Sequence, residues 1–224
     1  MNSIDPKRLA AEKAVEYVSD GMTIGLGTGT TAYWAIQKIG EQVKNGLKIR
    51  AVSSSGESSS LAQKLNIPLV DINSINSIDL TIDGADEVDP EKNLIKGGGG
   101  ALLREKILAT HTKKYFIVVD ESKIVKQLGT FPLPVEIIPF AANLTLKKIQ
   151  SLGCTAQLRV KNGKEFITDN GNLIADCKFG VITKAVELNA RLHNIAGVVE
   201  TGLFTGFAPV VIVGYNKGQV KVLE

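Results

Sequence analysis

The chain has 224 residues, of which 44% are hydrophobic and 22% charged, and its 26 basic and 23 acidic side chains give a formal charge of +3. That length fits one large domain or two small ones. No run of Lys and Arg is longer than two residues, and no apolar run approaches the ~20 residues of a membrane span, so neither nucleic acid nor a membrane is expected as a partner. The two cysteines, Cys154 and Cys177, match no metal-site spacing and fit a reducing compartment. We therefore expect a soluble cytoplasmic protein.

The first half of the chain alternates between helix-like and strand-like segments. Asp5-Pro6 is a typical helix start, and Gly21 would end that helix. Apolar residues then recur at helical spacing from Ala32 to Val43. The patterns further predict strands over 22–27, 47–52, 67–72, 78–83 and 115–120, with helices over 58–65 and 101–110. Strands alternating with helices predict an α/β domain with a mainly parallel sheet.

The pattern changes after Thr130, where "FPLPVEIIPF" brings three prolines into ten residues. The elements that follow have the order β-α-β-β-α-β, the ferredoxin-like arrangement. A last apolar segment, "APVVIVGY", is a buried type of strand that would rejoin the first sheet. The sequence thus predicts a Rossmann-like domain, residues 1–130 plus 206–224, with a smaller α+β domain inserted over 131–205.

Polar loops follow the predicted strands, and ligands of open α/β sheets bind beyond the carboxyl ends of the strands. The loop in "GLGTGTTA" has glycines that let backbone N–H groups approach an anion, the hydroxyls of Thr28, Thr30 and Thr31, and a helix start behind it. It predicts a phosphate site, although a tight turn with a threonine cap would use the same residues. The dinucleotide and P-loop fingerprints fit poorly, because the third glycine is missing and no Gly-Lys-Ser/Thr follows.

Two further motifs carry ionisable groups. "DGADEVD" places four carboxylates within 83–89, which suits hydrogen bonds to sugar hydroxyls but also a solvated acidic turn, and its spacing is wrong for a calcium loop. "KGGGGALLREK" joins Lys96 and a bare backbone to Glu105, about one turn into a predicted helix. The amides and the lysine can stabilise an oxyanion and Glu105 can act as a general base, although the helix dipole alone also favours an acid there. Together these residues indicate a metal-free acid–base enzyme acting on an anionic, hydroxylated substrate.

These stretches together resemble ribose-5-phosphate isomerase of the A type. The joint occurrence of DGAD, KGGG and the glutamate of REK is highly specific, and the matching motifs run in the family's order from residue 25 to 204: "GLGTGTTA", "AVSSS", "DGADEVD", "KGGGGALLREK", "DESK", "FPLPVEIIP", "TDNGN" and "GVVETGLF". The resemblance implies interconversion of D-ribose 5-phosphate and D-ribulose 5-phosphate through an enediolate, without metal or other cofactor, in the non-oxidative branch of the pentose phosphate pathway. It also implies a homodimer, or in some members a tetramer.

The resemblance further assigns roles to individual residues. Glu105 would be the base that moves a proton between C2 and C1, Asp83 would assist opening of the sugar ring, and Lys96 would steady the developing oxyanion. Within the binding residues the threonine loop would meet the phosphate, and Asp86 the substrate hydroxyls. The full substrate-binding set would be Thr28, Gly29, Thr30, Thr31, Asp83, Gly84, Ala85, Asp86, Lys96, Gly97, Gly98, Gly99 and Lys123. The resemblance also suggests that Lys7 contacts the phosphate, but the motif around Lys7 is weak. The chain departs from the family at Leu103, where relatives often carry threonine.

Other enzymes of related fold and a non-catalytic binding module are the alternative functions. A sugar-phosphate deaminase would use an Asp-His pair, but neither His111 nor His193 lies in a strand-end motif. A CoA transferase would not need the DGAD and KGGG motifs together. A non-catalytic sugar-phosphate-binding module, as in regulators, would be expected to carry a DNA-binding or partner region, and no extra domain is left over.

Overall fold

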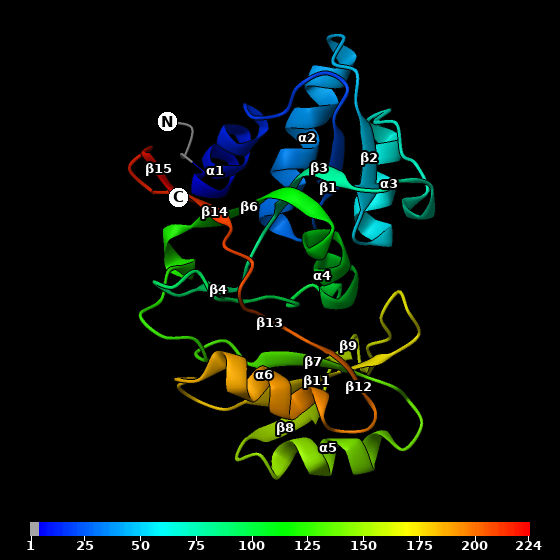
Figure 1. The fold of residues 1–224 in the computed structure, drawn as a ribbon, viewed down its shortest axis with the longest axis vertical. Coiled ribbons are helices and arrows are strands. Elements are labelled where there is room, and N and C mark those ends of the chain that lie inside the picture. Colours follow the sequence, from blue (N-terminus) through cyan, green and yellow to red (C-terminus); the bar gives the residue numbers. More distant parts are fainter. Residues whose placement is uncertain (1–4) are drawn as a thin grey trace. The chain divides into compact units, whose positions relative to one another are not determined.

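A computed structural model describes residues 5–224, which divide into two compact units (Figure 1). The first unit comprises the chain up to Ala85 together with Arg104–Lys123 and Phe207–Glu224. The second comprises Asp86–Leu103 and Ile124–Gly206. The predicted insertion, 131–205, lies wholly in the second unit, which also takes in 86–103 and 124–130. That 131–205 forms a domain of its own stays a prediction.

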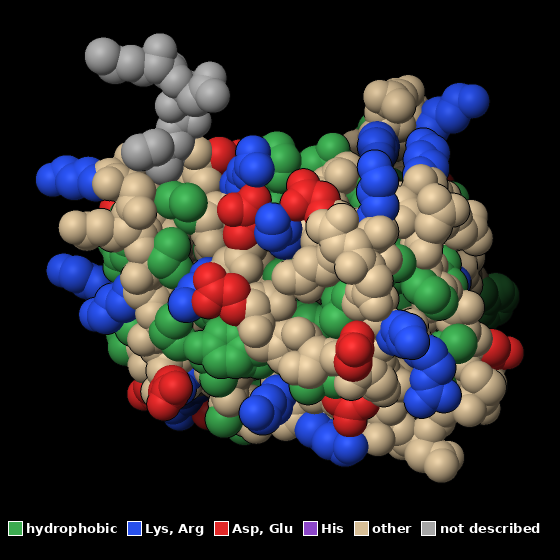
Figure 2. All heavy atoms as spheres, turned by 90° about the horizontal axis from the view of Figure 1, so that it is seen from above, with side chains coloured by type: hydrophobic (Ala, Val, Ile, Leu, Met, Phe, Trp, Pro, Cys, Tyr) green, Lys and Arg blue, Asp and Glu red, His purple; other side chains and the backbone are tan. Residues whose placement is uncertain are grey.

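Two surface properties bear on the expected partners. No helix among the described residues is long and apolar enough to cross a membrane. On the face shown in Figure 2, Lys and Arg side chains are interspersed with Asp and Glu, so that face carries no basic patch.

The first unit is built on a six-stranded sheet in the order β15-β14-β6-β3-β1-β2. All its neighbouring strands are parallel except the β14–β15 hairpin. The strands are β1 (Thr23–Leu26), β2 (Arg50–Ser53), β3 (Ile78–Asp83), β6 (Thr112–Asp120), β14 (Val210–Gly214) and β15 (Val220–Leu223). This arrangement confirms the mainly parallel sheet and the return of the last apolar segment to it.

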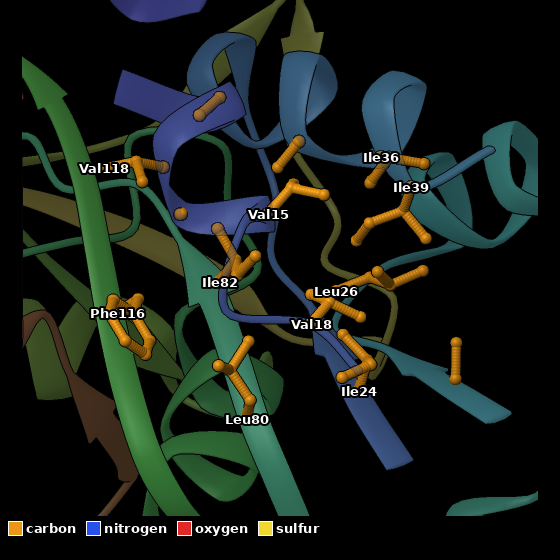
Figure 3. Close-up of a cluster of buried hydrophobic side chains, with 14 of the residues drawn as sticks. Val15, Val18, Ile24, Leu26, Ile36, Ile39, Leu80, Ile82, Phe116 and Val118 are labelled. Atoms are coloured by element: carbon orange, nitrogen blue, oxygen red, sulfur yellow. The ribbon is translucent and has the colours of Figure 1, made fainter. Parts of the chain in front are cut away.

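Four helices accompany this sheet along the chain: α1 (Pro6–Val15), α2 (Thr30–Lys44), α3 (Gly56–Lys64) and α4 (Leu102–Thr110). The Asp5 carboxylate caps α1 by accepting the backbone N–H groups of Lys7 and Arg8. Apolar side chains of α1 and α2 meet those of β1, β3 and β6 in one buried core; Figure 3 labels Val15, Val18, Ile24, Leu26, Ile36, Ile39, Leu80, Ile82, Phe116 and Val118. Such a core holds the strand ends, and the loops that follow them, in fixed positions.

One predicted strand is wrong. Residues 67–72 form only an isolated parallel bridge between Leu69 and Ala51, followed by a short 3₁₀ turn, η1 (Ile72–Ser74). The bridge uses the Ala51 N–H to the Pro68 carbonyl and the Val70 N–H to the Ala51 carbonyl. Pro68 has no N–H to extend the ladder, which explains why the segment stays outside the sheet.

The second unit contains a four-stranded antiparallel sheet in the order β12-β7-β11-β8. Along the chain its elements are β7 (Leu133–Ile137), α5 (Ala142–Gln150), β8 (Thr155–Leu158), β11 (Leu173–Lys178), α6 (Ala185–His193) and β12 (Val198–Thr201). This confirms the ferredoxin-like β-α-β-β-α-β order. A small hairpin, β9 (Val160–Lys161) and β10 (Lys164–Glu165), lies between β8 and β11 and was not predicted.

A three-stranded sheet in the order β13-β5-β4 completes the second unit. Its strands are β4 (Glu87–Val88), β5 (Leu94–Ile95) and β13 (Leu203–Phe204), and all pairs are antiparallel. Because β5 ends at Ile95, it delivers Lys96 and the glycine run directly after a buried strand.

Candidate active site

The strands β1, β2 and β3 end side by side. Leu26 pairs with Ser53 on one side and with Ile82 on the other, in parallel register. The carboxyl ends of the three strands therefore lie at one edge of the sheet. This register confirms that the loops starting at Gly27, Ser54 and Gly84 leave the sheet at a common edge, where open α/β sheets bind ligands.

Thr28 is the centre of a buried hydrogen-bond network at that edge. Its Oγ1 lies 2.7 Å from Ser54 Oγ and 2.9 Å from Ser55 Oγ, and its backbone N–H donates to Asp83 Oδ1 over 3.1 Å. The Ser58 hydroxyl donates to the Gly27 carbonyl over 2.6 Å. The network joins all three strand-end loops, so it fixes the loop that the sequence predicts to bind phosphate.

Helix α2 begins directly behind this loop. Its N-cap position is Gly29, with a φ of 100° that favours glycine, and no side chain caps the helix. The alternative of a threonine cap is therefore wrong: Thr30 Oγ1 instead accepts a hydrogen bond from Lys7 Nζ over 3.1 Å, and Thr31 is buried in the first turn. An uncapped helix N-terminus has backbone N–H groups available for an anion.

Two carboxylates of the first unit are almost completely buried. Asp83, at the end of β3, is 1% exposed, and its Oδ1 also accepts the Gly84 N–H over 2.8 Å. Glu105, in the first turn of α4, is 3% exposed. Acidic side chains are rarely buried this deeply unless they are paired. Lys123 lies half-buried in η2 (Glu121–Lys123), directly after β6.

The second unit holds Lys96 and the glycines. Lys96 is 2% exposed, its N–H donates to the Gly202 carbonyl over 2.9 Å, and its Nζ lies 5.4 Å from the centre of the Phe204 ring. The glycines form a turn in which the Gly100 N–H donates to the Gly97 carbonyl over 2.9 Å. Gly100 has a φ of +82°, and a Cβ there would lie 2.4 Å from the Phe166 ring, so a larger residue would strain the backbone and displace the ring.

The carboxylates of the acidic motif "DGADEVD" have different hydrogen-bond partners. Asp86 Oδ2 accepts the Gly98 N–H over 2.7 Å, which ties it to the glycine turn. Glu87 is buried and accepts the N–H groups of Gly129 and Phe131. Asp89 accepts both the N–H and the side-chain amide of Asn93. The motif is thus not a solvated acidic turn: Asp83 and Glu87 are buried, and each of its carboxylates accepts a hydrogen bond.

The predicted site residues fall on both units. The first unit brings together the threonine loop, Asp83 and the residues after it, and it also holds Glu105 and Lys123. The second brings together Asp86, Lys96 and the turn of Gly97–Gly99. Both histidines lie outside these groups: His111 contacts the Ile107 carbonyl and His193 contacts Glu200.

Sequence reasoning missed several residues in these groups. Ser54 and Ser55 belong to the matching motif "AVSSS" but carry no assigned role in the sequence analysis, yet their hydroxyls contact the Thr28 hydroxyl. Arg159 and Asp176 form an ion pair beside the glycine turn and belong to no motif. Only strand alternation, which places both on one face of the sheet, could have suggested that they lie together.

Within residues 5–224 there is no group of three or more His, Cys, Asp or Glu side chains arranged to hold a metal ion. The carboxylates of the acidic motif accept hydrogen bonds from within the protein instead.

The first unit has hydroxyls and a buried carboxylate at the strand ends of an open α/β sheet, and the second has a lysine-glycine turn beside an aspartate. These features are typical of α/β enzymes that act on small ligands. The sequence matches the family of ribose 5-phosphate isomerase A (phosphoriboisomerase A) over residues 50–218. The chain belongs to this family of aldose–ketose isomerases.

Individual relatives agree over nearly the whole chain. The chain is 56% identical to ribose-5-phosphate isomerase A of Bacillus mycoides over 95% of its own length and 96% of that protein's. It superposes on the ribose 5-phosphate isomerase A structure from Methanocaldococcus jannaschii with a TM-score of 0.93 and 42% identity, covering 98% of each chain. It also matches a D-ribose-5-phosphate isomerase solved in complex with phospho-erythronic acid, with a TM-score of 0.94 and 40% identity over the full length of both chains.

Proposed function

We propose that this protein interconverts D-ribose 5-phosphate and D-ribulose 5-phosphate through an enediolate, with Glu105 as the general base and no metal. Glu105 takes the proton from C2 of the open-chain aldose and returns it to C1. The proton of the C2 hydroxyl passes to the C1 oxygen, so the carbonyl moves from C1 to C2, and the reverse reaction uses the same groups. One carboxylate can serve both carbons because they are bonded to each other. The observation that carries the proposal is the deep burial of Glu105 on the helix that follows the lysine-glycine turn.

Removing a proton next to a carbonyl places negative charge on the carbonyl oxygen. A preorganised donor aimed at such an oxygen is worth ~3–4 kcal/mol. We assign this task to Lys96 and the amides of the glycine turn. The Lys96 ammonium is enclosed and lies over the Phe204 ring, which suits a cation held in place. Asp83 assists ring opening, and Asp86 accepts hydrogen bonds from substrate hydroxyls.

The phosphate is assigned to the loop from Thr28 to Thr31. Support comes from the uncapped start of α2 and from the serine hydroxyls that hold Thr28. Lys7, which donates to Thr30 Oγ1, adds positive charge beside this loop. Gly84 and Ala85 follow Asp83 at the same sheet edge, and Lys123 is proposed as a further substrate contact.

The ligand of one relative carries the same three kinds of group that are assigned above to different residues. Phospho-erythronic acid, in the complex of a related isomerase, carries a carboxylate, hydroxyls and a phosphate. The proposed enediolate likewise carries an anionic oxygen on a planar carbon, hydroxyls and a phosphate. We therefore expect phospho-erythronic acid to inhibit this protein competitively with ribose 5-phosphate.

Replacing Glu105 by glutamine tests the base. Glutamine keeps the size of the side chain but cannot accept the proton, so we expect kcat to fall at least ~10²-fold. The assay follows ribulose 5-phosphate formation from ribose 5-phosphate, with circular dichroism to verify the fold.

Glu187→Gln is the matched control, because Glu187 lies in the first turn of α6 and is exposed. It should keep the parent rate. Near-normal turnover in Glu105→Gln would remove Glu105 as the base, while ammonia release or acyl-CoA turnover by the parent without pentose isomerisation would remove the proposed function itself. The proposed homodimer is tested separately, by mass photometry of the parent protein.

A further inference from the structure

Arg159 contacts the glycine turn directly. Its Nη1 donates to the Gly97 carbonyl over 2.9 Å and to the Gly98 carbonyl over 3.0 Å. All three residues belong to the second unit. Arg159 lies directly after β8, and its N–H donates to the Ile174 carbonyl of β11, so its backbone is fixed by the sheet.

Asp176 holds the guanidinium in place. Arg159 Nε donates to Asp176 Oδ2 over 2.9 Å and Nη2 donates to Oδ1 over 2.5 Å, which is a two-bond pairing of guanidinium with carboxylate. The two side chains are only 14% and 22% exposed. Strand alternation points Asp176 away from the face of the sheet on which Ala175 and Cys177 pack into the core with α5 and α6. The opposite face thus presents an oriented arginine to the turn.

The ring of Phe166 supports the same arrangement. The guanidinium carbon of Arg159 lies 5.8 Å from the centre of the ring, and the Phe166 N–H donates to the Arg159 carbonyl over 2.9 Å. The ring also occupies the space that a Cβ on Gly100 would need. The segment from Arg159 to Phe166 therefore contacts the turn at both of its ends.

Fixing the carbonyls fixes the amides. In a planar trans peptide the C=O and the N–H point in opposite directions. With the carbonyls of Gly97 and Gly98 directed at Arg159, the N–H groups of Gly98 and Gly99 are directed away from it. The Gly98 N–H meets Asp86 Oδ2 at 2.7 Å, and Gly98 and Gly99 are exposed. Glycine peptides rotate easily because no Cβ restricts them, so this direction depends on an external contact.

We propose that Arg159, held by Asp176, is a positioning residue for the isomerisation. It fixes two peptide planes of the glycine turn, and through them it sets the orientation of the Gly99 N–H and of the Asp86 carboxylate toward substrate. Arg159 itself takes no part in proton transfer. This inference rests on the proposed function, because it assigns the turn to the stabilisation of substrate oxygens.

The test is Arg159→Met, which keeps most of the length of the side chain and removes its donors. We expect kcat to fall about 10- to 100-fold, because a misplaced donor loses stabilisation of the transition state, while KM for ribose 5-phosphate changes less than about 3-fold. The primary deuterium isotope effect on kcat with ribose 5-phosphate deuterated at C2 should rise, since proton transfer then limits more of the turnover. Hydrogen exchange at the amides of Gly98 and Gly99 should become faster.

Two milder variants keep the test decisive if Arg159→Met folds poorly. Arg159→Lys retains one cation but cannot hold Asp176 and both carbonyls at once, so it should give an intermediate kcat. Asp176→Asn keeps the shape of the pair and should lower kcat less than Arg159→Met. Arg191→Met is the matched control, because Arg191 is an exposed arginine on α6 in the same unit, and it should behave as the parent.

The outcomes separate the two proposals. Unchanged kcat and isotope effect in folded Arg159→Met and Arg159→Lys would overturn the positioning role and leave the isomerase function intact. A lower melting temperature with unchanged kcat in the same variants would assign the pair to stability alone and would also overturn it. A parent protein that does not interconvert the two pentose phosphates would fail at the proposed function instead.

Discussion

Individual carboxylates with the same burial perform different tasks in this protein. Glu136 is completely buried on β7, and its Oε1 accepts hydrogen bonds from Thr168, Asn170 and Asn172. Glu87 is buried too and accepts two backbone N–H groups. These acids hold segments of the second unit together. Burial alone therefore does not identify a base, and the proposal for Glu105 also rests on its position, on the helix directly after the lysine-glycine turn.

Thr31 gives the sharpest test of the phosphate loop at the scale of one residue. Thr31→Ala should raise KM for ribose 5-phosphate about 10-fold or more, because a hydrogen bond to a charged group contributes ~1.5–3 kcal/mol. The value of kcat should change little, since the hydroxyl would contact the phosphate equally in substrate and transition state. Steady-state kinetics with both ribose 5-phosphate and unphosphorylated ribose measures the effect.

The loss should appear only with the phosphorylated sugar. Thr110→Ala is the control, because the Thr110 hydroxyl donates to the Lys106 carbonyl within α4 and is exposed. If Thr31→Ala raises KM equally for ribose and ribose 5-phosphate, or if the parent does not distinguish the two sugars, Thr31 does not bind phosphate.

The sequence offers candidate site residues where residues of suitable chemistry lie close together along the chain. The glycines, Lys96 and Glu105 stand within one stretch, so a motif contains them. Two features favour glycine at position 100: its positive φ and the Phe166 ring, which occupies the space of a Cβ. Only the first, which depends on the local backbone, could be anticipated from the sequence. Arg159 lies more than fifty residues from the turn that it contacts, and Asp176 contacts Arg159 rather than the turn, so local sequence patterns could not predict either contact.

At the scale of elements, the alternation of strands and helices predicted a mainly parallel sheet, and the wrong prediction of a strand at 67–72 has a local cause. Pro68 has no N–H to donate to a neighbouring strand, and this missing hydrogen bond outweighs the apolar pattern of the segment. The β9–β10 hairpin went unpredicted because it consists of two-residue strands with exposed, mostly charged side chains. Buried strands are recognised by apolar alternation, and this hairpin has none.

Asp79 ties the starting ends of three strands together, away from the strand ends that carry the predicted site. Its Oδ2 accepts the Thr23 N–H over 2.9 Å, and its Oδ1 pairs with Lys113 Nζ over 2.8 Å. The hydrogen bond from Lys113, and then that from Thr23, lowers the pKa of the Asp79 carboxyl below its ordinary value. A carboxyl with a lowered pKa in the folded state stabilises the fold at neutral pH.

This arrangement predicts a specific loss of stability in acid. The contribution of Asp79 should be complete above the ordinary pKa of aspartic acid, about 3.9, and disappear as the pH falls through the lower pKa of the folded state. Asp79→Asn should therefore reduce the free energy of unfolding at pH 7 by up to about 1 kcal/mol, the upper range for a partly exposed pair. Urea unfolding of parent and variant between pH 7 and pH 2.5 measures the difference.

The difference between parent and Asp79→Asn should shrink across that acid range. Lys113→Met, which removes the stronger hydrogen bond, should reproduce part of the loss at pH 7, and both variants should keep the parent kcat. Parallel curves for parent and Asp79→Asn at every pH would show that the fold does not depend on this ionisation.

At the scale of the whole molecule, the chain alternates between the two units inside its functional motifs. It passes from the first unit to the second between Ala85 and Asp86, within DGADEVD, and back between Leu103 and Arg104, just before Glu105. The sequence predicts one insertion after residue 130 because the composition changes at the prolines there. The composition does not change at the two unit boundaries within these motifs, so the sequence does not indicate them. The division follows packing: Ile95 joins the core of β7 and β11, whereas Leu108 packs with Val52 and Ile78.

The same molecule-wide view leads to a prediction about metals. The acids of the functional motif are spread over the two units, and Asp86, Glu87 and Asp89 each accept hydrogen bonds from within the second unit. A divalent cation would need several of these oxygens at one point, with oxygen ligands at about 2.0–2.6 Å. In the proposed mechanism, Lys96 and the glycine amides supply the positive charge and the donors without an ion. We therefore expect the purified protein to retain its full rate of ribose 5-phosphate isomerisation after dialysis against EDTA and after incubation with 1,10-phenanthroline.

Activity that is lost with chelator and returns with Mg²⁺, Mn²⁺ or Zn²⁺ would show that an ion, not Lys96, balances the oxyanion. Lys96→Met separates these cases, because it should abolish turnover with or without added metal only if the lysine provides the charge.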